Sequence, residues 1–128
     1  MADTKARERP LSPHMQIYRW PLPMMMSILH RITGVGLYFG TILIAWWLIA
    51  VASGPGGYSR FTSFINSWVG RLILFGYTWA LIHHMFGGVR HFIWDTGHGY
   101  GANEREWLVR VGLAGSIVTT VVLWIVVR

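Results

Sequence analysis

The sequence of 128 residues has no cysteine and few charged residues. Without cysteine, the chain can form neither disulfides nor thiolate metal sites, and it cannot attach a c-type haem through thioether bonds. Charged residues make up 12% of the chain and hydrophobic residues 53%, whereas a soluble domain carries about 25% charged residues. The mean hydropathy is +0.42. This composition excludes an ordinary soluble domain and indicates an integral membrane protein.

Three apolar stretches have about the length that crosses a bilayer as a helix, which is ~20 residues. They are Ile32–Ala52, Leu72–Val89 and Val111–Val127. Amphipathic soluble helices would each show a polar face, and the segment YFGTILIAWWLIAVA at 38–52 shows none. We therefore expect an all-α fold with a single transmembrane domain over residues 1–128. Its parts are an N-terminal segment at 1–23 and helices at about 24–52, 63–94 and 104–127.

Further absences narrow the class of membrane protein. The polar first 23 residues lack the apolar core of a signal peptide, so the first span should remain as an anchor. There is no internal repeat of the kind that builds inverted-repeat transporters. The net charge is +6, but the basic residues flank the spans and form no patch for nucleic acid. Their distribution places the N-terminus and the second loop in the cytoplasm, at an inner (cytoplasmic) membrane.

The second span carries imidazoles inside a membrane-length segment, which is costly and needs a reason. His84, Gly88 and His91 are spaced i, i+4, i+7, so they share one stripe of a helix, with the two histidines about 10 Å apart along its axis. A neutral imidazole at depth can ligate haem iron. Arg90 and His91, nearer the boundary, could pair with its propionates, and the Gly87–Gly88 pair would leave room for the ring.

Two other interpretations of these histidines stay open. His84 could instead form a hydrogen bond between helices, and His83, about 100° away on the helix, is expected to face a partner or the lipid interface. Two residues of one straight helix cannot provide both axial ligands of a haem. Because neither other span has a deep histidine, a haem bound here would need its second ligand from another subunit.

The start of the first span brings together Ser27, His30 and Arg31, at i, i+3 and i+4. A hydroxyl, an imidazole and a guanidinium at the membrane boundary suit a quinone, whose carbonyl oxygens accept hydrogen bonds. The arginine would also stabilise negative charge that develops during reduction. The alternative is that Ser27 caps the helix and that Arg31 only sets topology.

Three other polar residues lie outside these two groups. We expect Asp95, directly after the second span, to form a salt bridge with Arg90 or Arg31. His14 suits a surface or docking residue better than a ligand. The sequence assigns no role to His98.

Three motifs together resemble the cytochrome b556 subunit of succinate dehydrogenase, the C membrane anchor of respiratory Complex II. They are RPLSPHMQIYRW at 9–20, SILHRITG at 27–34 and HHMFGGVRHFIWD at 83–95. The motifs occur in the order of that family, and the resemblance covers essentially the whole chain. The SILHRITG and H-x6-RH elements are specific as a pair, although either would be weak alone.

The resemblance implies roles for individual residues. His84 matches the axial ligand of haem b, and His30 and His91 match residues near its propionates. Ser27 and Arg31 match residues of the ubiquinone site. The chain would be half of a heterodimeric anchor, with the second haem ligand supplied by the other anchor subunit. Electrons would come from an iron–sulfur subunit, which receives them from a flavoprotein subunit that oxidises succinate.

The sequence therefore predicts a membrane-anchor subunit of succinate:ubiquinone oxidoreductase that performs no covalent chemistry of its own. Two alternatives are a haem-free structural anchor for a membrane-bound redox enzyme and a histidine-based proton conductor. The haem's occupancy and potential, the quinone type, the direction of the reaction and any higher oligomer of the complex cannot be predicted from the residues.

Overall fold

The computed structural model describes His14 and residues 17–127, and these residues form an all-α fold. The helices are α1 at Leu22–Ala52, α2 at Pro55–Asn66, α3 at Trp68–Asp95 and α4 at Ala102–Val126. Helices α1, α3 and α4 are each long and apolar enough to cross a membrane. The predicted all-α integral membrane fold is confirmed. Most of the predicted N-terminal segment lies outside the described residues.

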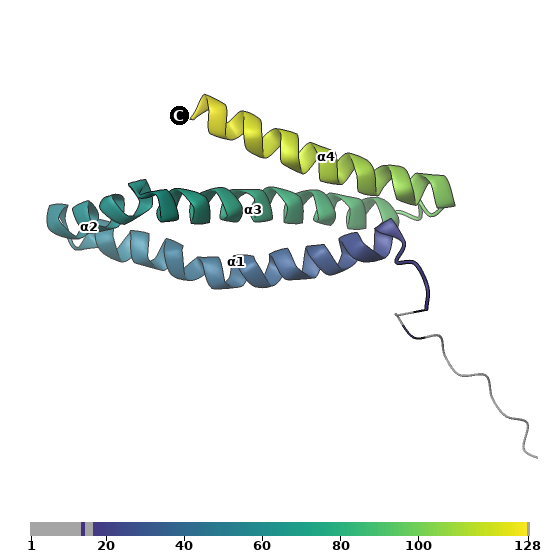
Figure 1. Ribbon diagram of the computed structural model, residues 1–128, viewed down its shortest axis with the longest axis horizontal. Helices are drawn as coiled ribbons and strands as arrows, with labels where there is room; N and C mark the ends of the chain where they lie inside the picture. Colours follow the sequence, from purple (N-terminus) through teal and green to yellow (C-terminus); the bar gives the residue numbers. More distant parts are fainter. Residues whose placement is uncertain (1–13, 15–16, 128) are drawn as a thin grey trace, which may run out of the picture.

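Helix α3 lies between α1 and α4, and consecutive long helices run antiparallel (Figure 1). The start of α1 and the turn between α3 and α4 are at one end of the molecule, whereas α2 and the C-terminus are at the other. The polar residues at the start of α1 therefore share an end with the last turns of α3, as the sequence predicted.

Helix α2 was not predicted, and the second spanning helix, expected from about residue 63, begins only at Trp68. The helix-breaking residues Gly54-Pro55-Gly56-Gly57 gave no sign of a helix directly after α1. Gly54 has a φ of 82°, which turns the chain after α1. Pro55 then occupies the first helical position, where its missing N–H costs nothing. Trp46 of α1 contacts the rings of Phe61 and Phe64, with both centroid separations 5.1 Å. This aromatic contact holds α2 against the end of α1.

Small residues let α1 and α3 approach each other closely. A Cβ added at Gly40 would overlap the ring of Tyr77, and one added at Gly87 would overlap the ring of His30. In a bilayer there is no hydrophobic driving force between helices, so such close packing supplies much of their attraction. These glycines therefore make room for rings of the facing helix.

Helix α4 packs against α3 through small and hydroxyl-bearing residues. Phe86 of α3 lies over Gly115, where an added Cβ would be 3.0 Å from the ring. Ser116 and Thr120 are fully buried, and their hydroxyls donate to carbonyls of their own helix at 2.8 and 2.7 Å. Buried hydroxyls satisfied in this way carry little cost in lipid.

The turn between α3 and α4 depends on two glycines with positive φ, Gly97 at 81° and Gly99 at 80°. The indole N–H of Trp94 donates to the carbonyl of Gly99 at 3.1 Å, and the hydroxyl of Tyr100 donates to the carbonyl of Trp94 at 2.9 Å. The expected salt bridge of Asp95 is wrong. Within the described ranges the ion pair is Arg110 with Glu106, and Asp95 is exposed.

Candidate functional site: a histidine cluster between α1 and α3

Two histidines from different helices stack face to face at the centre of the site. The rings of His30 on α1 and His84 on α3 lie with centroids 4.0 Å apart and planes 6° from parallel. Both side chains are half-buried. The stack fixes the register of the two helices at this level of the membrane.

Each of the two rings also reaches the backbone of the other residue. Nδ1 of His84 donates to the carbonyl oxygen of His30 at 3.1 Å, and Nε2 of His30 donates to the carbonyl oxygen of His84 at 3.2 Å. Because a carbonyl only accepts, these contacts select the tautomer of each ring. In neutral His84 the proton is on Nδ1, which leaves the lone pair of Nε2 available to a metal.

Two further residues of α1 support His84, and the sequence interpretation did not single them out. The hydroxyl of buried Thr33 donates to the carbonyl of His30 at 2.9 Å, and its oxygen lies 3.4 Å from Nδ1 of His84. A Cβ at Gly34 would be 3.0 Å from Cε1 of the same ring. In the sequence, the only indication of this support is a threonine and a glycine within about one turn after His30. Their importance depends on which face of α1 meets α3, and the sequence does not show this.

The cluster extends toward the end of the molecule through His91, whose ring centroid lies 5.3 Å from those of His30 and Trp94. His91 is exposed. Arg90 is only 6% exposed, and its guanidinium carbon lies 5.3 Å from the centre of the Trp94 ring. Its buried Nε has no hydrogen-bond partner. The guanidinium therefore extends from a buried position toward this end of α3.

The two glycines at 87 and 88 differ in the space around them. His30 occupies the space beside Gly87, so this glycine leaves no room for a cofactor ring, contrary to the expectation. A Cβ at Gly88 would meet no atom within 4 Å. Gly88 follows His84 by one helical turn and therefore gives α3 a smooth, open surface next to that histidine.

Ser27 and Arg31 lie on the first turns of α1, one turn apart. Helix α1 begins at Leu22, and no side chain caps its start, so the interpretation of Ser27 as a helix cap is wrong. Ser27 is half-buried, whereas Arg31 is exposed. The contact between His30 and His91 places both residues at the same end as the last turns of α3.

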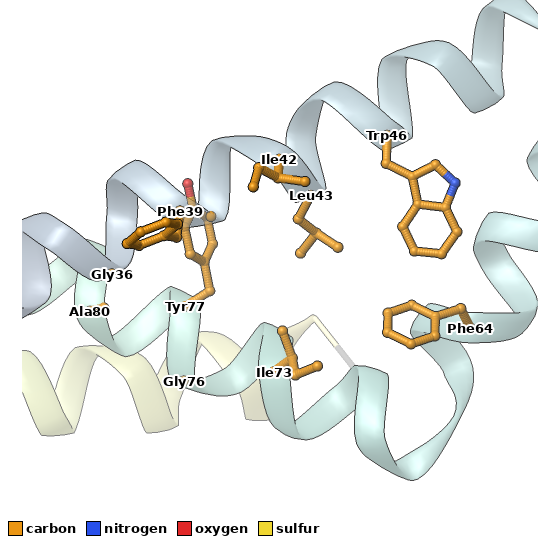
Figure 2. Close-up of a pocket in the computed structure, with 11 residues that line it drawn as sticks. Gly36, Phe39, Ile42, Leu43, Trp46, Phe64, Ile73, Gly76, Tyr77 and Ala80 are labelled. Atoms are coloured by element: carbon orange, nitrogen blue, oxygen red, sulfur yellow. The ribbon is translucent and has the colours of Figure 1, made fainter.

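An apolar cavity of about 490 Å³ begins near the histidine pair and continues toward α2. Figure 2 shows Gly36 and Ala80 at one end of it and Trp46 facing Phe64 at the other. Ala80 precedes His84 by one helical turn. The histidine cluster is therefore confined to one end of the contact between α1 and α3, and the cavity beyond it is lined by apolar residues and by Tyr77.

His83 has different surroundings, although it adjoins His84 in sequence. It is 3% exposed, and its Nδ1 donates to Oγ of Ser116 on α4 at 3.3 Å. Its ring stacks on Trp79, with centroids 5.2 Å apart. The expectation that His83 faces a partner or the lipid interface is wrong, because α4 covers it.

The described residues include no group of three or more histidine, cysteine or carboxylate side chains that could hold a metal ion. The arrangement instead offers one imidazole nitrogen beside an open surface, with donors toward one end. Such a set could hold the iron of a flat anionic cofactor from one side, provided that a second chain supplies the opposite ligand.

Comparisons with known proteins identify the family of the chain. A model of the family described as succinate dehydrogenase/fumarate reductase transmembrane subunit matches residues 5–127. The succinate dehydrogenase cytochrome b556 subunit of Paracoccus denitrificans is 42% identical over 126 residues, which cover 98% of this chain and 97% of the relative. That of Rickettsia felis is 36% identical over 121 residues, covering 92% of each chain. The mitochondrial cytochrome b560 subunit of Sus scrofa is 41% identical over 96 residues, covering 71% of this chain and 55% of the relative.

Proposed function

Because the chain belongs to the family of succinate dehydrogenase/fumarate reductase transmembrane subunits, we propose that it is a membrane-anchor subunit of succinate:ubiquinone oxidoreductase. It binds haem b together with a second anchor subunit and forms part of the site where ubiquinone is reduced. The chain supplies position, hydrogen bonds and charge, and the redox chemistry belongs to the cofactors.

The observation that carries the proposal is the tautomer of His84. The carbonyl of His30 accepts from Nδ1, which leaves Nε2 as an uncharged donor for iron. Thr33 and Gly34 hold the ring in place. The open surface at Gly88 suits the flat face of a porphyrin. The residues present therefore fit one half of a haem site.

The other axial ligand comes from the second anchor subunit. Within the described part of the chain, His30 is the imidazole stacked on His84, and the two rings lie face to face with centroids 4.0 Å apart, which leaves no room for an iron between them. His83 is covered by α4, and His91 is two turns away from His84 along α3. The iron–sulfur and flavoprotein subunits complete the enzyme.

Residues at the end of α3 that carries His91 would hold the propionates of the haem. His30 and His91 are the imidazoles nearest that end. Arg90 supplies a positive charge behind them, with no carboxylate among the described residues paired to it. An anionic group beside this cluster would offset the cost of the buried guanidinium.

Ubiquinone binds at the start of α1. The hydroxyl of Ser27 donates a hydrogen bond to one quinone carbonyl, and the guanidinium of Arg31 stabilises the negative charge that develops there. Since Ser27 does not cap α1, its hydroxyl is available for this role. The N-terminus lies in the cytoplasm, so the aqueous phase beside Arg31 provides the protons.

Haem binding is tested by a reduced-minus-oxidised absorption spectrum of the purified complex. We expect a b-type α-band in the wild type and its loss in His84→Ala. An unchanged band in an assembled His84→Ala complex would rule out this residue as the ligand. A wild-type complex without any such band would instead favour the haem-free anchor, and proton conductance by this chain alone would favour the relay.

The quinone site has its own test. Ser27→Ala and Arg31→Ala should lower ubiquinone reduction by about 10- to 100-fold, the size expected when a donor to developing charge is removed. Succinate oxidation with a soluble artificial acceptor should persist. Equal loss of both activities would point to failed assembly and contradict a direct role.

A further inference from the structure

A second cavity, of about 540 Å³, opens at the other end of the molecule. Helices α2, α3 and α4 line it, and α1 contributes no residue to it. Its lining residues are Ile65, Asn66, Arg71, Leu74, Thr78, Leu123, Trp124 and Val127. We call this cavity the α3–α4 groove. In Figure 1, α4 diverges from α3 toward the end of α4, and the residues that line the groove come from these two helices, from α2 and from the residue after α4.

The groove has a polar mouth and apolar walls. Arg71 and Asn66 lie where α2 meets the start of α3, whereas Leu74, Leu123 and Trp124 form the walls. Thr78 is two helical turns beyond Arg71, which is about 10 Å along α3. Its hydroxyl is already bonded to the carbonyl of Leu74 at 2.7 Å. The groove therefore matches a molecule with one polar end and an apolar tail.

The charges near the groove indicate that the polar end of the bound molecule is negative. No aspartate or glutamate occurs between Glu8 and Asp95, so this end of the bundle carries Arg60 and Arg71 without a carboxylate on α2 or on the first half of α3. The guanidinium of Arg71 has no ion pair within the described part of the chain. None of the described residues of the chain therefore supplies its counterion.

We propose that the α3–α4 groove binds a phospholipid, with the phosphate on Arg71 and one acyl chain between α3 and α4. Arginine pairs with phosphate through two parallel hydrogen bonds, and an arginine near the end of a transmembrane helix extends its guanidinium to the level of the lipid headgroups. The proposal requires only that the helices span a bilayer, so it does not depend on haem or quinone binding.

An acyl chain is the occupant that fits the groove best. It is thin and flexible, so a space of about 540 Å³ beside Leu74 and Trp124 can hold it. A helix of a partner subunit, about 10 Å wide, could cover the opening instead, and the cross-linking measurement below distinguishes the two.

The test is native mass spectrometry of the whole purified complex in detergent, titrated with phosphatidylglycerol. We expect Arg71→Gln to weaken the tightest lipid binding about tenfold, which is the effect of losing one charge-assisted contact, and Arg71→Lys to keep most of it. Arg60→Gln is the matched control, because it removes the same charge at the same end but does not line the groove. Binding that is equal in Arg71→Gln and wild type would overturn the proposal.

Two further measurements address the tail and the rival occupant. Leu123→Trp keeps Arg71 but fills the groove, and it should weaken lipid binding as well. Diacylglycerol, which has no phosphate, should bind at least tenfold more weakly than phosphatidylglycerol, and equal binding would overturn the role of Arg71.

Because the chain has no cysteine, Leu123→Cys gives this chain a single thiol. Its efficient cross-linking to another subunit would show that a protein covers the groove, and would also overturn the proposal.

Discussion

His83 and His84 are chemically identical neighbours, yet the structure gives them opposite surroundings. His84 lies between α1 and α3, half-buried, with one nitrogen bonded and the other available. His83 lies between α3 and α4, 3% exposed, with Ser116 as its partner. The 100° between successive residues of a helix is the only difference that the sequence imposes. The role of a histidine in a membrane helix therefore depends on which helix covers it and not on its depth alone.

The largest predicted effect comes from filling the space that the histidine pair needs. Gly87→Ala would place a methyl group where the ring of His30 lies, so the stack must open or the helices must separate. We expect a loss of about 1–3 kcal/mol in stability, as for other overpacked sites, together with reduced haem content. Thermal unfolding of the purified complex, followed by its haem absorption, measures both.

Gly76→Ala, on the same helix, is the matched control for that variant, since there the added methyl group meets no atom of the chain within 4 Å. Its effect on stability should stay within about 0.5 kcal/mol. If both glycine variants were equally stable, the close contact at Gly87 would have no energetic weight.

A smaller effect is expected when the buried pair between α3 and α4 is removed. His83→Leu loses the hydrogen bond to Ser116, and such bonds between transmembrane helices contribute about 0.6 kcal/mol on average and about 1.7 at most. The midpoint of thermal unfolding should fall accordingly, while the b-type band stays. Loss of the band in an assembled His83→Leu complex would mean that the two histidines do not have separate roles.

The smallest effect is expected at Thr33, whose oxygen lies at a long 3.4 Å from Nδ1 of His84. Thr33→Val removes this contact and leaves the bond from His84 to the carbonyl of His30. Because partners of a metal-binding histidine change affinity by roughly 10- to 100-fold, and the main partner here remains, haem affinity should fall by about tenfold at most. Haem retention during dilution in detergent measures it, and Thr41→Val, at an exposed threonine of α1, is the control.

Hydropathy was sufficient to predict the three spanning helices, because each one has to satisfy its backbone within itself and cover about 30 Å of hydrocarbon. It could not reveal α2. That helix has only 12 residues, begins with Pro55-Gly56-Gly57 and is held by aromatic contacts with Trp46. Those contacts depend on where the end of α1 lies, which no local pattern encodes.

The candidate site, too, was predictable from the sequence only in part. The spacing of His84 and His91 on α3, and of Ser27 and His30 on α1, could be read directly from helical periodicity. The direction in which each helix faces could not. As a result, the space expected at Gly87 proved to be filled by His30, and the burial of His83 depended on the position of α4. The roles of Ser27, Arg31 and His91 toward ligands stay predictions.

The paired bonds between His30 and His84 join the first turns of α1 to the middle of α3. Each ring holds the backbone of the other helix, so sliding one helix past the other by a single residue, 1.5 Å, would strain both bonds together. Ser27 and Arg31 lie within one helical turn of His30 and therefore of these paired bonds. In the proposed function, the same two imidazoles would thereby set the distance that an electron crosses between the haem and the quinone, and any slippage between the helices would lengthen or shorten that distance.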